Sequence, residues 1–194
     1  MTRRRLLQSA AVVLLLALAG WAVSRGLDRL AGGPPADAGS SADPTAPSAD
    51  VRHITATLFF GSADGQALVG VRREVPLADG VVPQGREILT AQLQSAPEPY
   101  VSVIPQGTTL RAFYITDRGD AFIDLSGEVS SAHGGGSSTE LLTVYALVHA
   151  VTANLPSIRR VQILVDGREV DTLAGHVDLR RPLDPDPSLV RQEP

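Results

Sequence analysis

The sequence predicts an α+β domain, a two-layer sandwich in which two helices cover one face of a mixed β-sheet. Several short segments alternate apolar and polar residues, which is the pattern of strands with one buried face. Two longer segments repeat apolar residues every three or four positions, as helices with one buried face do. In chain order these segments read β-β-α-β-β-α-β-β. Because such helices need a sheet to cover their apolar face, we expect one helical layer on one sheet, preceded by a membrane helix and a linker.

The chain begins with a basic segment and a long apolar segment. Residues 1–5 include three arginines, and residues 6–25 contain an apolar run that is broken only by Gln8 and Ser9. As a helix this run would be about 27 Å long, close to the roughly 30 Å hydrocarbon core of a membrane. We therefore expect a single-pass anchor with a cytoplasmic start and an extracytoplasmic C-terminal domain. Signal cleavage near Ala19 is the alternative, and it would leave a secreted or periplasmic domain.

The rest of the chain divides into a linker, a domain and a tail. Residues 31–50 are Gly, Pro, Ala, Ser and Asp almost throughout, a composition that buries too little apolar surface to fold. We expect a disordered linker there and a folded domain at residues 51–183. Residues 184–194 contain three prolines and several charges, and they are predicted to form a flexible tail.

The first half of the predicted domain contains two strands and a helix. Residues 54–60 alternate apolar and polar side chains, and residues 68–77 form a second strand. Pro76 lacks the N–H that a central strand would donate, so this second strand is predicted at a sheet edge. A helix is predicted over residues 83–95, because two prolines follow it closely.

The second half contains a hairpin, a long helix and a closing pair of strands. Residues 108–116 and 119–125 are predicted to pair across a turn, and residues 141–155 repeat apolar side chains at helical spacing. Ser137 and Glu140 are three positions apart just before that run, which is the spacing of a capping box. Strands are then predicted at residues 158–165 and 169–173, joined by a tight turn at Asp166 and Gly167.

Several spaced motifs resemble the family of GerMN domains, named after the spore-germination protein GerM, over roughly residues 52–183. The motifs are the Gly-rich segment before Glu140-Leu141-Leu142, then Tyr145-Ala146-Leu147-Val148, Val161-Gln162-Ile163-Leu164-Val165-Asp166-Gly167 and Gly175-His176-Val177-Asp178. The first half fits in order through Leu58-Phe59-Phe60, Val75-Pro76-Leu77, Ile104-Pro105-Gln106-Gly107-Thr108 and Ala121-Phe122-Ile123-Asp124-Leu125-Ser126. The resemblance implies the same β-β-α-β-β-α-β-β layout and a kinship with ring-building modules of secretion and sporulation channels. The chain carries one copy of the module.

Composition excludes several kinds of chemistry. The chain has no cysteine, which excludes a disulfide, a thiolate zinc site and a cysteine nucleophile. All seventeen basic side chains are arginine, so a Schiff-base lysine and a P-loop lysine are also excluded. A formal net charge of -4 and an aromatic content of 4% argue against nucleic acid as a partner.

Two segments could hold an ion. The Gly134–Gly136 loop precedes a helix start and could bind an anion, but a hinge into the helix is favoured because the phosphate-binding glycine motifs do not match. His176 and Asp178 would point to one side of an extended segment and could begin a metal site with Asp171 or Asp166. Two neighbouring arginines oppose a cation there, so a structural role for His176 and Gly175 is favoured.

The remaining candidates are single polar side chains. His149 lies one turn after Tyr145, and we expect a half-buried histidine bonded to the backbone, because no G-x-S-x-G motif supplies a nucleophile. Asp124 and Ser126 are expected to end a strand. Glu128 and Glu140 leave glycoside hydrolysis formally open, since sequence does not give their separation. His133 and His53 have no partner in sequence.

The sequence therefore predicts no catalytic residue, no cofactor-binding residue and no metal ligand. We expect a non-enzymatic, membrane-tethered domain that binds or scaffolds proteins of the cell envelope, and the GerMN resemblance implies a sporulation- or germination-type assembly. Self-association is one expected form of this binding. A module that binds peptidoglycan or another ligand at the outer membrane face is the alternative. A hydrolase is the least favoured reading.

Overall fold

The computed structural model describes residues 52–191. The predicted basic start, membrane segment and linker lie outside the described residues. Within residues 52–191, no helix combines the length and the apolar character that crossing a bilayer requires.

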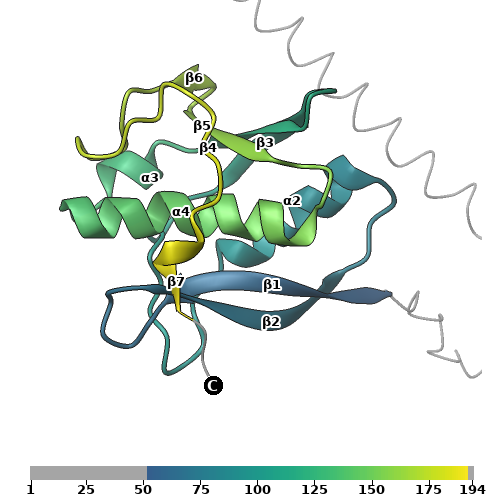
Figure 1. Cartoon of the computed structure of the whole chain (residues 1–194), viewed down its shortest axis with the longest axis horizontal. Helices are drawn as coiled ribbons and strands as arrows, with labels where there is room; N and C mark the ends of the chain where they lie inside the picture. Colours follow the sequence, from purple (N-terminus) through teal and green to yellow (C-terminus); the bar gives the residue numbers. More distant parts are fainter. Residues whose placement is uncertain (1–51, 192–194) are drawn as a thin grey trace, which may run out of the picture. The chain divides into compact units, whose positions relative to one another are not determined.

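Two sheets and two long helices make up the described chain (Figure 1). The first sheet has the order β1-β2-β7 and consists of β1 (His53–Gly61), β2 (Leu68–Pro76) and β7 (Val190–Arg191). The second has the order β3-β4-β5-β6 and consists of β3 (Leu110–Ile115), β4 (Asp120–Leu125), β5 (Arg160–Val165) and β6 (Arg168–Glu169). The helices are α2 (Val81–Gln92), the short α3 (Glu128–Ser131), α4 (Ser137–Asn154) and the 3-10 turn η1 (Pro187–Leu189).

The helices lie between the two sheets, so the predicted two-layer arrangement is wrong although the α+β class and the order of the main elements are right. Both α2 and α4 pack against strands of both sheets (Figure 1). The reason can be read along α4, where the six consecutive residues Ala146–Val151 are all buried. A run of six covers every side of a helix, so α4 needs neighbours on more than one face.

The first sheet is a long hairpin with a short third strand. β1 and β2 pair antiparallel from His53 opposite Pro76 to Gly61 opposite Leu68. Pro76 was expected to mark an edge strand, yet β2 lies between β1 and β7. β7 pairs with it only at Leu68 and Val69, at the end of β2 that is far from the proline. The rest of that edge of β2 remains unpaired by β7.

The second sheet follows the predicted hairpin and turn. β3 and β4 pair antiparallel, and α4 then carries the chain back so that β5 pairs parallel with β4. The turn into β6 has positive φ at Asp166 (50°) and Gly167 (76°), as the sequence indicated. β6 is only two residues long, whereas strand was predicted up to Leu173. The N–H groups of Leu173 and Ala174 instead bond to the carboxylate of Glu140.

Two side-chain amides occupy the outer edge of β1. The amide of Gln92, at the end of α2, accepts from the N–H of Phe59 at 2.8 Å and donates to its carbonyl at 2.7 Å. Asn154, at the end of α4, does the same for Thr57 at 2.8 and 2.7 Å. These amides replace a neighbouring strand, which ties both helices to the first sheet and satisfies backbone groups that would otherwise be left without partners.

Residues 184–191 do not form the predicted flexible tail. Leu183 exchanges two backbone hydrogen bonds with Val161 beside β5, and Val190 then pairs with Leu68 of β2. This last segment therefore runs from one sheet to the other (yellow in Figure 1). Prolines break regular structure, but they do not prevent a segment from packing, and here apolar and hydrogen-bonding contacts on both sheets order it.

Candidate functional site

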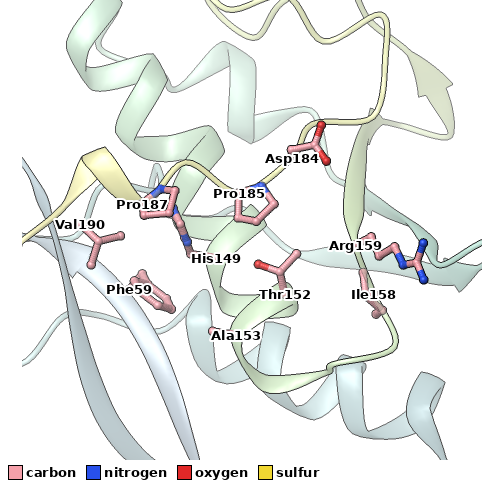
Figure 2. Close-up of a pocket in the computed structure, with 10 residues that line it drawn as sticks. All are labelled: Phe59, His149, Thr152, Ala153, Ile158, Arg159, Asp184, Pro185, Pro187 and Val190. Atoms are coloured by element: carbon pink, nitrogen blue, oxygen red, sulfur yellow. The ribbon is translucent and has the colours of Figure 1, made fainter.

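An open groove of about 740 Å³ lies between β1, the C-terminal half of α4 and the last segment of the chain. Figure 2 shows its lining, with Val190 at one end and Arg159 and Asp184 at the other. The volume falls in the range of ligand-binding sites, but the groove is open to solvent along its length. Such a shape does not enclose a small molecule on all sides.

Four separate parts of the chain build this groove, one of which is the segment between α4 and β5 with Ile158 and Arg159. His149, Thr152 and Ala153 come from one face of α4, because residues three and four apart lie together on a helix. Phe59 comes from β1, which is buried on both faces at this end of the strand. The prolines of the last segment close the remaining side (Figure 2).

His149 fixes the last segment to α4. Its side chain lies 5.2 Å from the ring of Phe59 and 6.2 Å from that of Tyr145, measured between centroids. Its Nε2 lies 2.9 Å from the carbonyl oxygen of Asp186. A carbonyl can only accept, so Nε2 carries the proton and the neutral ring donates it. Burial lowers the pKa of His149, while the carbonyl and the charge of Asp186 act in the opposite direction.

Polar groups lie on the α4 side of the groove and at one of its ends. Thr152 lines the groove, and its hydroxyl donates to the carbonyl of Val148 at 2.8 Å. Arg159 and Asp184 are exposed at the same end (Figure 2). Opposite charges on the rim of an apolar groove select the orientation of a partner and contribute little to affinity. The arrangement provides apolar contact flanked by one positive and one negative group.

A second group of polar residues surrounds Glu140, and it overturns the predicted capping box. α4 begins at Ser137, whose side chain makes no cap hydrogen bond, and Gly136 precedes it with φ of 90°. The carboxylate of Glu140 is fully buried and turns away from its own helix start. It accepts the N–H groups of Leu173 at 2.8 Å, Ala174 at 2.9 Å and His176 at 2.8 Å.

Glu140 therefore holds the loop that contains the Gly175-His176 motif. The Nδ1 atom of His176 also lies 3.2 Å from the carboxylate. Burial alone would raise the pKa of Glu140, but the N–H groups of Ala174, His176, Leu173 and Val177 outweigh it and lower this pKa. Gly175 and His176 therefore have a structural role, as the sequence favoured: they belong to the loop that Glu140 holds.

The residues considered for a metal site have separate partners. His176 is bonded to Glu140, whereas Asp178 pairs with Arg180, whose Nη2 lies 2.7 Å from its Oδ2. Asp166 lies 3.5 Å from Arg111. Among residues 52–191, no group of three or more potential ligands is close enough to hold a metal ion.

The other carboxylates close turns. Asp124 accepts the N–H of Gly167 at 2.7 Å and lies 3.4 Å from Arg111, so it joins β4 to the turn before β6. Ser126 accepts the N–H of Thr109 at 3.0 Å. A hydrogen bond from the same serine lowers the pKa of the exposed Glu128. Asp124 and Ser126 lie at the end of β4, as the sequence indicated, whereas Glu128 begins α3.

His133 and His53, for which the sequence offered no partner, differ in whether the structure gives them hydrogen bonds. His133 accepts the N–H of Gly135 at its Nδ1 (3.0 Å), and its Nε2 lies 3.2 Å from the hydroxyl of Thr143. It therefore orders the Gly-rich loop, which was expected to act as a hinge. His53 is exposed at the start of β1.

Sequence reasoning missed the groove and both amide contacts on β1. Gln92 and Asn154 are ordinary polar residues near helix ends, and nothing in their spacing indicates that they bond to a strand. The groove depends on the last segment, which composition alone marked as flexible. Of the lining residues, His149 is the one that the sequence analysis considers as a candidate site residue, for its place one turn after Tyr145.

The fold defined by these elements is that of a GerMN domain. The tandem GerMN domains of the sporulation protein GerM from Bacillus subtilis match with a TM-score of 0.52 and 18% identity, covering 70% of this chain and 46% of that chain. The first GerMN domain of the same protein matches with a TM-score of 0.50 and 20% identity, covering 69% and 96%. At these identities the likeness shows the fold alone.

The family is shown by the sequence profile. The profile of the Germane family, described as sporulation and spore germination, matches residues 57–171, more than half of the chain. This chain belongs to that family, which confirms the resemblance. A presumed lipoprotein of Clostridium perfringens is 28% identical, with a TM-score of 0.49 over 72% of this chain and 93% of that one. A search of curated proteins finds no match.

Proposed function

We propose that this chain is a non-enzymatic, membrane-tethered extracytoplasmic domain that binds a partner protein of the cell envelope through the groove beside His149. Membership of the sporulation and spore germination family supports an envelope role. The apolar run in residues 6–25, after a basic start, supports the tether. The observation that carries the proposal is the groove, which offers apolar surface with one charge of each sign on its rim.

The polar chemistry of the groove supports binding over catalysis. A general base needs a free ring nitrogen directed at a substrate proton. Here Nε2 of His149 donates to a backbone carbonyl, and the hydroxyl of Thr152 donates to another. Nε2 of His149 and the hydroxyl of Thr152 are therefore engaged in holding the fold, and the one remaining ring nitrogen, Nδ1, is not by itself a catalytic set, which favours contact as the role of this surface.

Photo-crosslinking in the native membrane tests this function. A photoreactive residue at Thr152 or Asp184 is expected to form an adduct with one and the same envelope protein. The matched control is the same residue at Arg168, which is exposed on β6 beside Val165, at the other end of β5 from Arg159. Equal adducts from all three positions would contradict the proposal. Retention on purified peptidoglycan without a protein adduct would favour the wall-binding alternative.

A further inference from the structure

The outer edge of β2 is open over a short stretch. The backbone N–H and C=O groups of Phe59 and Gly61 point away from β2, since they bond to Gln92 and Val101 on the other side of β1. The same holds for every second residue of β1. In an antiparallel pair, the residue opposite each of these directs its own N–H and C=O away from β1, and Arg72 and Glu74 are two such residues. Among residues 52–191, these N–H and C=O groups have no hydrogen-bond partner.

The open stretch has clear limits. β7 pairs with Leu68 and Val69 at one end, and Pro76 has no N–H to offer at the other. The side chains of Arg72 and Glu74 are exposed between these limits. Figure 1 shows β7 beside only one end of β2. In contrast to the edge of β1, this stretch is not covered by side-chain amides from the described chain.

We propose that this edge pairs antiparallel with the same edge of a second copy of the chain. Arg72 of each copy then lies opposite Glu74 of the other, and the two-fold axis passes beside Arg73. The charges identify the occupant, because a strand that reads Arg-Arg-Glu is complementary to itself in this register. Opposite charges in cross-strand pairs stabilise such a contact, whereas like charges there destabilise it.

Arg73 does not oppose this pairing. Successive side chains of a strand point to opposite faces, so Arg73 lies on the other face from Arg72 and Glu74. Its guanidinium lies 5.5 Å from the centre of the Phe60 ring and donates to the carbonyl of Ser95 at 3.5 Å. These contacts draw the charge toward its own subunit and away from the axis.

The contact is small, so its association is weak and reversible. Two pairs of Arg72 and Glu74 provide four backbone hydrogen bonds and two ion pairs. Such an edge-to-edge contact lies well below the area of a permanent dimer. Tethering of both copies to one membrane would raise their effective concentration. The pairing uses Arg72, Arg73 and Glu74 of β2, none of which lines the groove beside His149, so its test is independent of the test of the proposed function.

Disulfide trapping tests the pairing, because the native chain has no cysteine. Residues at the axis of an antiparallel pair have nearby Cβ atoms, so Arg73→Cys is expected to form a disulfide between copies. The full-length variant in a mild nonionic detergent is oxidised gently, and the rate of dimer formation is measured. Failure of Arg73→Cys to crosslink faster than Tyr114→Cys, an exposed cysteine on β3, would overturn the proposal.

Charge reversal then tests the register. Adding Arg72→Glu, or Glu74→Arg, to the Arg73→Cys chain is expected to slow crosslinking roughly tenfold, since each change places like charges opposite each other. Mixing the two variants restores opposite charges and is expected to restore the rate. Arg118→Glu is the matched control and is expected to have no effect. Circular dichroism verifies that each variant is folded. Equal rates in all charge variants, or no recovery in the mixture, would overturn the pairing.

Discussion

At the residue scale, Glu140 shows how one side chain joins distant parts of the chain. A buried carboxylate is unfavourable unless hydrogen bonds replace its water. Glu140 receives three backbone N–H groups from a loop that follows it by more than thirty residues. This loop has little regular structure, so its backbone N–H groups need hydrogen-bond partners other than a neighbouring strand. The same interaction occupies the N–H of Leu173, where the sequence predicts strand.

Replacement of this carboxylate should be costly. Glu140→Gln substitutes a donor for one acceptor oxygen and leaves at least one buried N–H without a partner. We expect a loss of about 2–3 kcal/mol in the free energy of unfolding, measured by urea denaturation. The control is Glu128→Gln, which is exposed and should change stability little. An equal effect of the two variants would contradict the assigned role of Glu140.

His149 should make stability depend on pH. Burial lowers its pKa, so the unfolded chain takes up this proton at a higher pH than the folded chain does. The stabilisation is complete above the unfolded pKa of about 6.5 and decreases as the pH falls below it. His149→Gln should flatten the change in unfolding free energy between about pH 7 and pH 5. The exposed His53→Gln is the control, and an identical pH profile for wild type and His149→Gln would contradict this assignment.

At the scale of elements, most helices and strands are where the local pattern places them. The β3–β4 hairpin, the Asp166-Gly167 turn and α4 follow from alternation, turn residues and helical spacing. Each of these signals acts between residues near in sequence, which is why the sequence carries them. The capping box predicted at the start of α4 was wrong, because the carboxylate of Glu140 bonds to a distant loop and not within its own helix.

The contact of α2 with β1 depends on one amide. Gln92→Ala would leave the N–H and C=O of Phe59 buried without partners and create a cavity. We expect a loss of about 2–4 kcal/mol in the free energy of unfolding. Gln92→Met fills the space without the hydrogen bonds and should also destabilise the fold. Gln94→Ala, at an exposed position two residues on, is the control. A Met variant as stable as wild type would show that packing alone matters.

At the scale of the whole molecule, the last segment links the two sheets. It begins beside β5 at Leu183, is held by His149 through Asp186, and ends beside β2 at Val190. It also forms one wall of the groove. The site of the proposed function therefore exists only when both sheets and α4 are assembled.

Removal of this segment should weaken the domain as a whole. A chain that ends at Leu183 loses β7 and exposes apolar surface on Phe59 and Leu68. We expect a loss of roughly 2–4 kcal/mol in the free energy of unfolding, measured by urea denaturation. Arg191→Ala removes only the exposed ion pair with Asp64 and should change stability little. Unchanged stability of the shortened chain would show that the segment is a passive tail.

The sequence by itself determined the family, the α+β class, the order of the main elements and the turn chemistry, because these depend on residue type and on spacing between neighbours. Only the tertiary structure decided that the helices lie between two sheets, that Glu140 serves a distant loop and that the last segment completes a groove. Each of these results from backbone and side-chain groups that find partners far along the chain. A local pattern shows that such a group needs a partner, but it does not show which distant residue provides one.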